Sequence, residues 1–290
     1  AIADYKNRRI IFLCVISLPL ITLEKMFMAR ISTLLFLVAL LLVQTNSIAQ
    51  QKSKGKKEFY QFTLYHYSTV EQEKILDTYL KDALLPALHR MNIQTVGVFK
   101  PWGNDTLTSK LLYVFIPLSS IDKTITIKEK LQTDEVYLAA GAAYINSLHN
   151  LPPYDRIETI LTASFPLAPT MKLPALKSSK KERVYELRSY ESATEKIFDN
   201  KVHMFNEGDE IGLFAKLNFN AVFYSSVIAG SKIPNLMYMT CFENMTDRNA
   251  HWKSFGDDPG WKKLSSMPEY QNNVSHIDIT FLQPADYSDF

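Results

Sequence analysis

The sequence predicts an α+β protein that contains two copies of one unit. The first observation is a repeated motif: Phe62-Thr-Leu-Tyr-His-Tyr67 runs into Ser68-Thr-Val-Glu71, and Tyr185-Glu-Leu-Arg-Ser-Tyr190 runs into Ser192-Ala-Thr-Glu195. Each is an alternating strand that leads into Ser-x-x-Glu, the capping box that opens a helix. The second observation is that later landmarks keep the same order, for example Val96-Gly-Val-Phe99 and Asn220-Ala-Val-Phe223. A repeat of this length indicates a duplicated domain.

The first unit, residues 50–164, begins with a predicted strand at 59–67 and a helix over 69–91. That helix carries apolar residues at helical spacing, and Pro86 is expected to kink or shorten it. Strands at 95–100 and 110–117 form a hairpin around the turn Pro101-Trp-Gly-Asn-Asp105. A helical stretch to about residue 149 and a closing strand at 156–163 complete the unit.

The second unit, residues 182–290, follows the same order. Strands are predicted at 183–190, 220–227, 235–242 and 275–282, with a helix over 194–216 and another from about residue 247. Asp258 before Pro259 indicates an N-cap with proline at the first helical position, so a further short helix begins there. Residues 165–181 contain three prolines and a lysine-rich run, which indicates a linker.

Strand, helix, strand, strand, helix, strand is the order of the ferredoxin-like motif, in which helices cover one face of an antiparallel sheet. The strands at 111–116 and 236–242 are apolar at nearly every position, which indicates that both of their faces are buried. We therefore expect two ferredoxin-like units whose sheets pack face to face within one chain. A homodimer formed through equivalent units is the competing arrangement.

The first 49 residues predict export. The apolar stretch 31–43 follows Arg30 and precedes small residues at Ser47 and Ala49, as in a secretory signal cleaved after Ala49. At 13 residues it is shorter than the about 18 that a membrane span needs. We interpret residues 1–27 as an upstream extension before Met28 and expect a mature periplasmic or extracellular protein. A two-segment membrane anchor is the alternative, because a second apolar run covers residues 10–21.

Charge and cysteine content narrow the classes of function. The chain has 32 basic and 30 acidic residues, and removal of residues 1–49 leaves 27 and 28, a net charge of −1. This balance gives no electrostatic reason to expect a nucleic-acid partner. Cys241 is the one cysteine left, so no intramolecular disulfide can form and the fold depends on its core.

Three motifs of the second unit resemble the NIPSNAP family of the dimeric α/β-barrel superfamily. They are Val184-Tyr-Glu-Leu-Arg-Ser-Tyr190, Arg248-Asn-Ala-His-Trp252 and Asp257-Asp-Pro-Gly-Trp261. The first unit departs from this pattern, with Tyr65 where the second has Arg188, and reads as a degenerate partner that closes the barrel. The resemblance implies a superfamily that includes cofactor-free oxygenases and haem-handling proteins, and it implies no particular reaction.

Strand alternation sorts the candidate binding residues by face. Tyr185 and Leu187 are expected to face the helices, which would leave the polar side chains of their strand in a cleft between the sheets. Applied to all strands, this reasoning places eight residues in that cleft: Tyr65, Tyr67, Glu158, Glu186, Arg188, Tyr190, His276 and Asp278. Such a lining is typical of a site for a small polar or aromatic molecule. The alternative is a hydrogen-bond network that only holds the barrel shut.

The favoured function is therefore non-enzymatic binding of a small molecule or protein through the cleft. The alternative is a cofactor-independent oxygenase or isomerase, in which His276 and Asp278 could form an acid/base pair. No cofactor is predicted, and no histidine and cysteine spacing matches a zinc site. Trp252 and Trp261 are expected to pin helices onto the sheet rather than form a lid.

Overall fold

The computed structural model describes residues 57–290. The predicted signal segment, its cleavage after Ala49 and the first residues of the predicted first unit lie outside this range. Among the described residues, no helix combines the length and the apolar character that crossing a bilayer requires.

The N-terminal half begins as predicted, but its first helix starts one residue later than the capping box placed it. Thr69, not Ser68, is the N-cap, and its hydroxyl accepts from the Gln72 amide while the Gln72 side chain accepts from Thr69. A π-helical turn, Leu80–Leu84, precedes Pro86, which thereby stands at the start of the next helical segment, where its missing N–H costs little. The elements are β1 (Phe59–Tyr67), α2 (Val70–Tyr79), α3 (Leu85–Arg90), β2 (Gly97–Pro101), β3 (Lys110–Leu118), α4 (Lys123–Leu131), α5 (Glu135–Ala140), α6 (Ala142–Ile145) and β4 (Arg156–Ser164).

The C-terminal half has the same order of strands and helices. Its first helix is capped by Thr194, whereas the hydroxyl of Ser192 donates to the Asn273 carbonyl instead. Asp258 caps the short helix that begins at Pro259, as predicted. The elements are β5 (Val184–Glu191), α7 (Glu195–Asn206), α8 (Glu210–Lys216), β6 (Ala221–Ala229), β7 (Asn235–Phe242), α9 (Met245–Asp257), α10 (Pro259–Ser266) and β8 (His276–Pro284).

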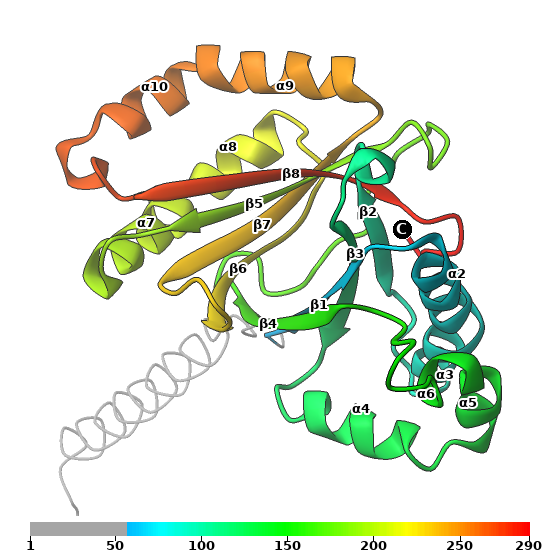
Figure 1. Ribbon diagram of the computed structural model, residues 1–290. Coiled ribbons are helices and arrows are strands. Elements are labelled where there is room, and N and C mark those ends of the chain that lie inside the picture. Colours follow the sequence, from blue (N-terminus) through cyan, green and yellow to red (C-terminus); the bar gives the residue numbers. More distant parts are fainter. Residues whose placement is uncertain (1–56) are drawn as a thin grey trace, which may run out of the picture. The chain divides into compact units, whose positions relative to one another are not determined.

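All eight strands close into one antiparallel barrel in the order β1-β3-β2-β8-β5-β7-β6-β4. The two halves join edge to edge, through β2 against β8 and β4 against β6, so their inner faces meet across one enclosed interior. The connector 165–181 follows the barrel wall, with the amides of Phe165 and Lys172 donating to β6 carbonyls. Helices α2, α3, α5 and α6 lie outside the N-terminal strands and α7–α10 outside the C-terminal ones (Figure 1).

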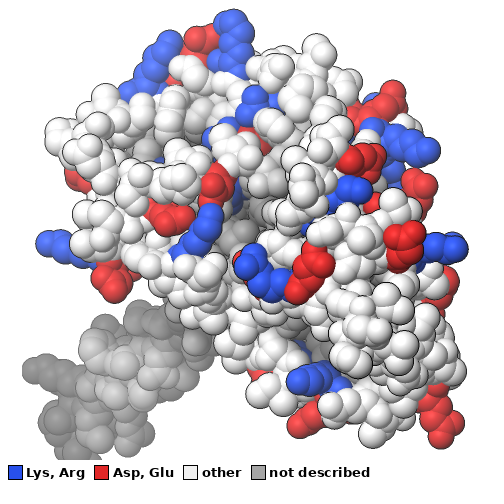
Figure 2. Space-filling model, viewed as in Figure 1, with Lys and Arg blue, Asp and Glu red and all other residues white. Residues whose placement is uncertain are grey.

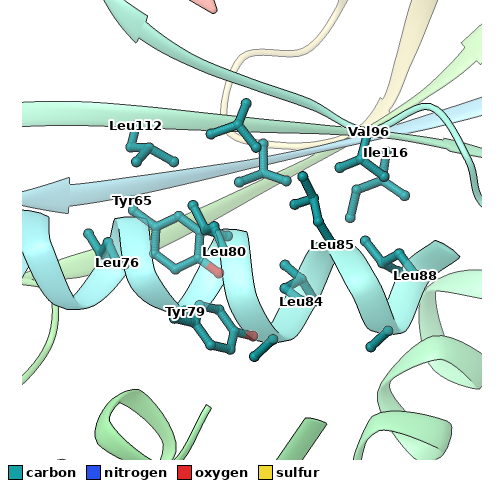
Figure 3. Close-up of a cluster of buried hydrophobic side chains, with 14 of the residues drawn as sticks. Tyr65, Leu76, Tyr79, Leu80, Leu84, Leu85, Leu88, Val96, Leu112 and Ile116 are labelled. Atoms are coloured by element: carbon teal, nitrogen blue, oxygen red, sulfur yellow. The ribbon is translucent and has the colours of Figure 1, made fainter. Parts of the chain in front are cut away.

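The outer layers explain why nearly every position of the central strands is apolar. On the N-terminal side, Leu76 of α2, Leu80 of the π-helical turn and Leu88 of α3 pack on the outward residues of β1 and β3, which include Tyr65 and Leu112 (Figure 3). Because the opposite faces of the same strands fill the barrel interior, both faces are buried, as the sequence predicted.

One end of the barrel interior is filled by an aromatic plug. It consists of Tyr60, Phe62, Phe99, Phe115, Tyr185, Phe223 and Phe290. Ring centroids within it lie 5.0–6.0 Å apart, for example 5.0 Å between Phe99 and Tyr185 and 6.0 Å between Tyr185 and Phe290. The plug makes this end of the barrel a packed core.

Candidate functional site

The faces of β5 are the reverse of the sequence prediction. Tyr185 and Leu187 point into the barrel and belong to its core, whereas Glu186, Arg188 and Tyr190 face the helices. The prediction was wrong because it assumed that the charged side chains of Glu186 and Arg188 would need a polar cleft. The partners that make burial of these charges tolerable lie on α9, far along the sequence.

Tyr65 and Tyr67 are also outside the predicted cleft, on the helix-facing side of β1. The Tyr65 ring lies against Tyr144 and Tyr154, with centroids 6.4 and 6.0 Å away. The Tyr67 hydroxyl accepts from Asn104 Nδ2 at 2.8 Å. Both tyrosines are therefore part of the packing between the sheet and its helices.

The other three predicted residues, Glu158, His276 and Asp278, come together at the open end of the barrel. Glu158 pairs with the inward-facing Leu64 of β1, and Asp278 pairs with Ser189 of β5. His276 pairs with Glu191 on the same face, one step further out. The strand register therefore places these three residues on the inner face of the barrel wall.

These strand ends surround a cavity of about 370 Å³, which we call the mouth cavity. Its apolar lining comes from both halves: Leu64, Tyr113, Ile160, Leu187, Val227 and Met237. Polar groups add His66, Glu158, Ser189, Asn235, Asp278 and Thr280, with Lys232 from the loop between β6 and β7. Along β1, the inward positions change from Tyr60 and Phe62 of the plug to Leu64 and His66 at the cavity, so the plug is its floor.

Two charged groups stand on opposite sides of the mouth cavity. On one side, Glu158 Oε1 lies 2.8 Å from His66 Nε2 and 2.6 Å from Arg156 Nη2. On the other, Asp278 is bound by Lys232 Nζ and lies 3.0 Å from His276 Nε2. The Lys232 hydrogen bond holds the pKa of Asp278 below its usual range, although partial burial opposes this, and His276 adds to the effect. Asp278 can therefore act as an ionised acceptor at neutral pH.

Tyr113 adds a hydroxyl to the wall of the cavity. Burial raises its pKa, and the charges of Glu158 and Asp278 add to this effect, which outweighs a hydrogen bond with Thr280. The phenol consequently stays neutral at physiological pH. It offers a ligand a hydrogen-bond donor rather than a negative charge.

The buried charges of the C-terminal half form a separate network around Glu186, which is completely buried. Glu186 Oε1 accepts from Arg188 Nε at 2.7 Å and Arg248 Nη2 at 2.8 Å, and Oε2 accepts from Arg248 Nε at 2.8 Å and Trp252 Nε1 at 2.7 Å. The Arg188 guanidinium stacks on the Trp252 ring, 3.7 Å from its centroid. These groups satisfy one another within a packed layer, so the network holds α9 on the sheet.

Tyr190 continues this network and is not at the base of a pocket. Its hydroxyl accepts from Arg188 Nη1 at 2.9 Å and lies 2.8 Å from the Tyr238 hydroxyl. The sequence analysis did not identify Arg248 and Trp252 as partners of Glu186. Their spacing of four residues in the motif Arg248-Asn-Ala-His-Trp252 places both on one helix face, and this spacing was the signal that could have indicated it.

Charge on the surface is mixed. Figure 2 shows acidic and basic side chains interspersed over the viewed face, without a broad area of one sign. Within residues 57–290, one group of metal-ligating side chains is close enough to share an ion: Glu191, His276 and Asp278, whose ligand atoms lie within 4.8 Å of one another. This group lies at the rim of the mouth cavity.

Comparison with known proteins supports the resemblance seen in the second unit. Residues 185–289 match the NIPSNAP family model, which confirms the resemblance in the C-terminal half. A crystal structure of a NIPSNAP family protein from Agrobacterium tumefaciens is 18% identical over 40% of this chain and 98% of its own, with a TM-score of 0.34. No curated protein matches the sequence.

Two crystal structures resemble most of the chain. A proposed monooxygenase from Lactobacillus acidophilus has a TM-score of 0.50 and 10% identity, covering 79% of this chain and 94% of its own. Another proposed monooxygenase, from Fusobacterium nucleatum, has a TM-score of 0.50 and 6% identity, covering 79% and 93%. At these identities the likeness shows the fold alone.

Proposed function

We propose that this protein binds a small molecule in the mouth cavity. The observation that carries the proposal is the change along the barrel interior from an aromatic plug to a cavity of about 370 Å³. This volume lies within the range of about 300–1,000 Å³ typical of ligand sites, and an apolar lining with a few polar groups is their usual character. Leu64, Leu187 and Met237 would contact the body of the ligand, and Glu158, Asp278 and Tyr113 would orient its polar groups.

The alternative is a cofactor-independent oxygenase or isomerase, which the descriptions of the two structural relatives bring into consideration. Binding is the better supported function because one member of the expected acid/base pair is poorly placed. Asp278 lines the cavity, but the His276 side chain is 59% exposed at the rim. His276 therefore cannot meet a substrate enclosed at the base of the cavity.

We also infer that the two halves are copies of one ferredoxin-like unit. In support, the strand order β4-β1-β3-β2 in one half corresponds to β8-β5-β7-β6 in the other. Glu158 and Asp278 take equivalent inward positions near the start of β4 and β8. The cavity would then be assembled from corresponding parts of the two copies.

The ligand proposal predicts a selective effect of filling the cavity. Changing Ile160 to tryptophan should abolish ligand binding, because the larger ring would occupy the space in front of β4. Changing Ile157 to tryptophan is the matched control, since Ile157 lies on the same strand, faces outward and is partly exposed. Binding should be measured with protein purified from its own source, by native mass spectrometry for a retained molecule and by a thermal-shift screen.

The expected result is a ligand that stabilises the wild-type and Ile157→Trp proteins but not Ile160→Trp. Circular dichroism would verify that both variants are folded. A ligand that binds Ile160→Trp as well as it binds the wild type would place the site elsewhere.

Export is a separate proposal, supported by the apolar stretch 31–43 and the small residues that follow it. We expect the mature protein to begin at Gln50. N-terminal sequencing of protein from the exported fraction measures this directly, and recovery of residues before Ala49 would contradict it.

A further inference from the structure

The rim of the mouth cavity carries three metal-ligating side chains from two neighbouring strands. Glu191 of β5 is the register partner of His276 of β8, and Asp278 is the next inward residue of β8. His276 Nε2 and Asp278 Oδ1 are 3.0 Å apart, and a ligand atom of Glu191 lies within 4.8 Å of both. The group is thus fixed by paired backbone rather than by a loop.

A cation already occupies this group in the form of the Lys232 ammonium. Lys232 Nζ binds the Asp278 carboxylate and lies 3.9 Å from Glu191 Oε1. Its side chain is 50% exposed on the loop between β6 and β7, so it can turn to solvent without breaking the core. Within residues 57–290, no group hydrogen-bonds the Glu191 carboxylate, which is only 29% exposed. Glu191 is therefore a partly buried carboxylate whose one charged partner lies at 3.9 Å, so its oxygens can still accept a closer ligand.

The distances agree with a small divalent ion. Ligand atoms that lie about 2.0–2.2 Å from a tetrahedral Zn²⁺ are roughly 3.3 Å from one another. The His276 to Asp278 separation of 3.0 Å is already near this value. The Glu191 ligand atom lies within 4.8 Å of the other two, so a side-chain movement of at most about 1.5 Å would bring it to the same separation. One imidazole nitrogen with two carboxylate oxygens is a donor set that suits Zn²⁺ and leaves a fourth position open.

We propose that Glu191, His276 and Asp278 bind one divalent transition-metal ion, of which Zn²⁺ is the representative, and that Lys232 is displaced when the ion binds. The site goes beyond the proposed function, because metal binding does not require a ligand in the cavity. Asp278 belongs both to the proposed metal site and to the lining of the mouth cavity, so a bound ion would lie at the cavity rim.

Isothermal titration calorimetry of the full chain with Zn²⁺ alone tests the proposal. The wild type should bind one ion per chain. His276→Gln and Asp278→Asn should each weaken binding by about 100-fold or more, because even an outer partner of a ligand is worth about 10–100-fold. Lys232→Met should tighten binding, because it removes the competing ammonium. His89→Gln is the matched control, since His89 also pairs with an aspartate, Asp289, at 2.9 Å but lies on α3.

Co²⁺ absorption provides a second readout, because a bound ion with an imidazole ligand should give visible bands that the His276→Gln protein lacks. Circular dichroism would confirm that each variant is folded. Failure of both the wild-type and Lys232→Met proteins to bind Zn²⁺ would overturn the proposal. So would Zn²⁺ binding that survives in His276→Gln but falls in His89→Gln. Neither result for Zn²⁺ would change the test of ligand binding with Ile160→Trp, so the two proposals can fail separately.

Discussion

Replacing Glu186 by glutamine is expected to lower the free energy of unfolding by about 3–5 kcal/mol, the range for breaking a buried ion pair. Glu186 is completely buried and accepts hydrogen bonds from Arg188, Arg248 and Trp252. A neutral amide at this position would leave two guanidinium groups, both largely buried, without a counter-charge. The cost comes from those orphaned charges rather than from the loss of a favourable pair alone.

Urea denaturation followed by tryptophan fluorescence measures this loss, since Trp252 is part of the network. The control is Asp257→Asn, which breaks the exposed pair with Lys253 on the same helix and should change stability little, because exposed pairs contribute little. A double variant, Glu186→Gln with Arg248→Met, should recover part of the loss. A Glu186→Gln protein as stable as the Asp257→Asn control would show that the guanidinium groups reach water.

The same network predicts a pH dependence. Burial alone would raise the pKa of Glu186, but Arg248, Arg188 and Trp252 outweigh it and hold the pKa below its usual range. Because the folded-state pKa is the lower one, the stabilisation is fully present above the unfolded value of about 4.3 and is lost as the pH falls through the folded value. The stability difference between the wild type and Glu186→Gln should therefore be constant near neutrality and shrink below about pH 4.

The order of elements could be predicted because local signals define it. The cap formed by Asp258 with Pro259 was predicted, and the first cap, Thr69 with Gln72, lies one residue from the predicted Ser68 with Glu71. The direction of each strand face could not be predicted in the same way. Alternation in β5 separates Tyr185 and Leu187 from Glu186 and Arg188, but in a barrel wall covered by helices both sets are buried. Which set points inward depends on partners such as Arg248, which no local pattern connects to Glu186.

The residues of the mouth cavity also show that local sequence patterns do not reveal contacts between distant segments. Glu158 and Asp278 lie on the inner face of the barrel wall. For Asp278 the sequence carries a local signal, because Ile277 and Phe281 alternate with polar residues on β8. His66, Tyr113 and Lys232 were missed, since each comes from a different strand or loop and none has a partner nearby in sequence. They meet only through the register of β1 with β3 and β4 and through barrel closure, which requires pairings between distant segments.

Truncating Phe223 to alanine is expected to destabilise the whole barrel by about 3–5 kcal/mol, the usual cost of removing a buried aromatic ring. Phe223 lies on β6 in the C-terminal half, yet its ring packs on three rings of the N-terminal half. The centroid distances are 5.2 Å to Tyr60, 5.5 Å to Phe62 and 5.2 Å to Phe115. The resulting void would lie in the plug, where the closed strand ladder limits how far the neighbours can collapse.

This contact also predicts that the two halves unfold together. Phe223 does not contact α2 or α3. If the two halves share one core, Phe223→Ala should nevertheless reduce amide-exchange protection in α2 and α3 by the same free energy as in β6 and β7. Hydrogen exchange read by mass spectrometry measures both regions in one experiment. Val136→Ala, at a position 64% exposed on α5, is the control and should stay within about 0.5 kcal/mol of the wild type. Protection lost in β6 and β7 but retained in α2 and α3 would mean that the halves fold independently and that the plug does not couple them.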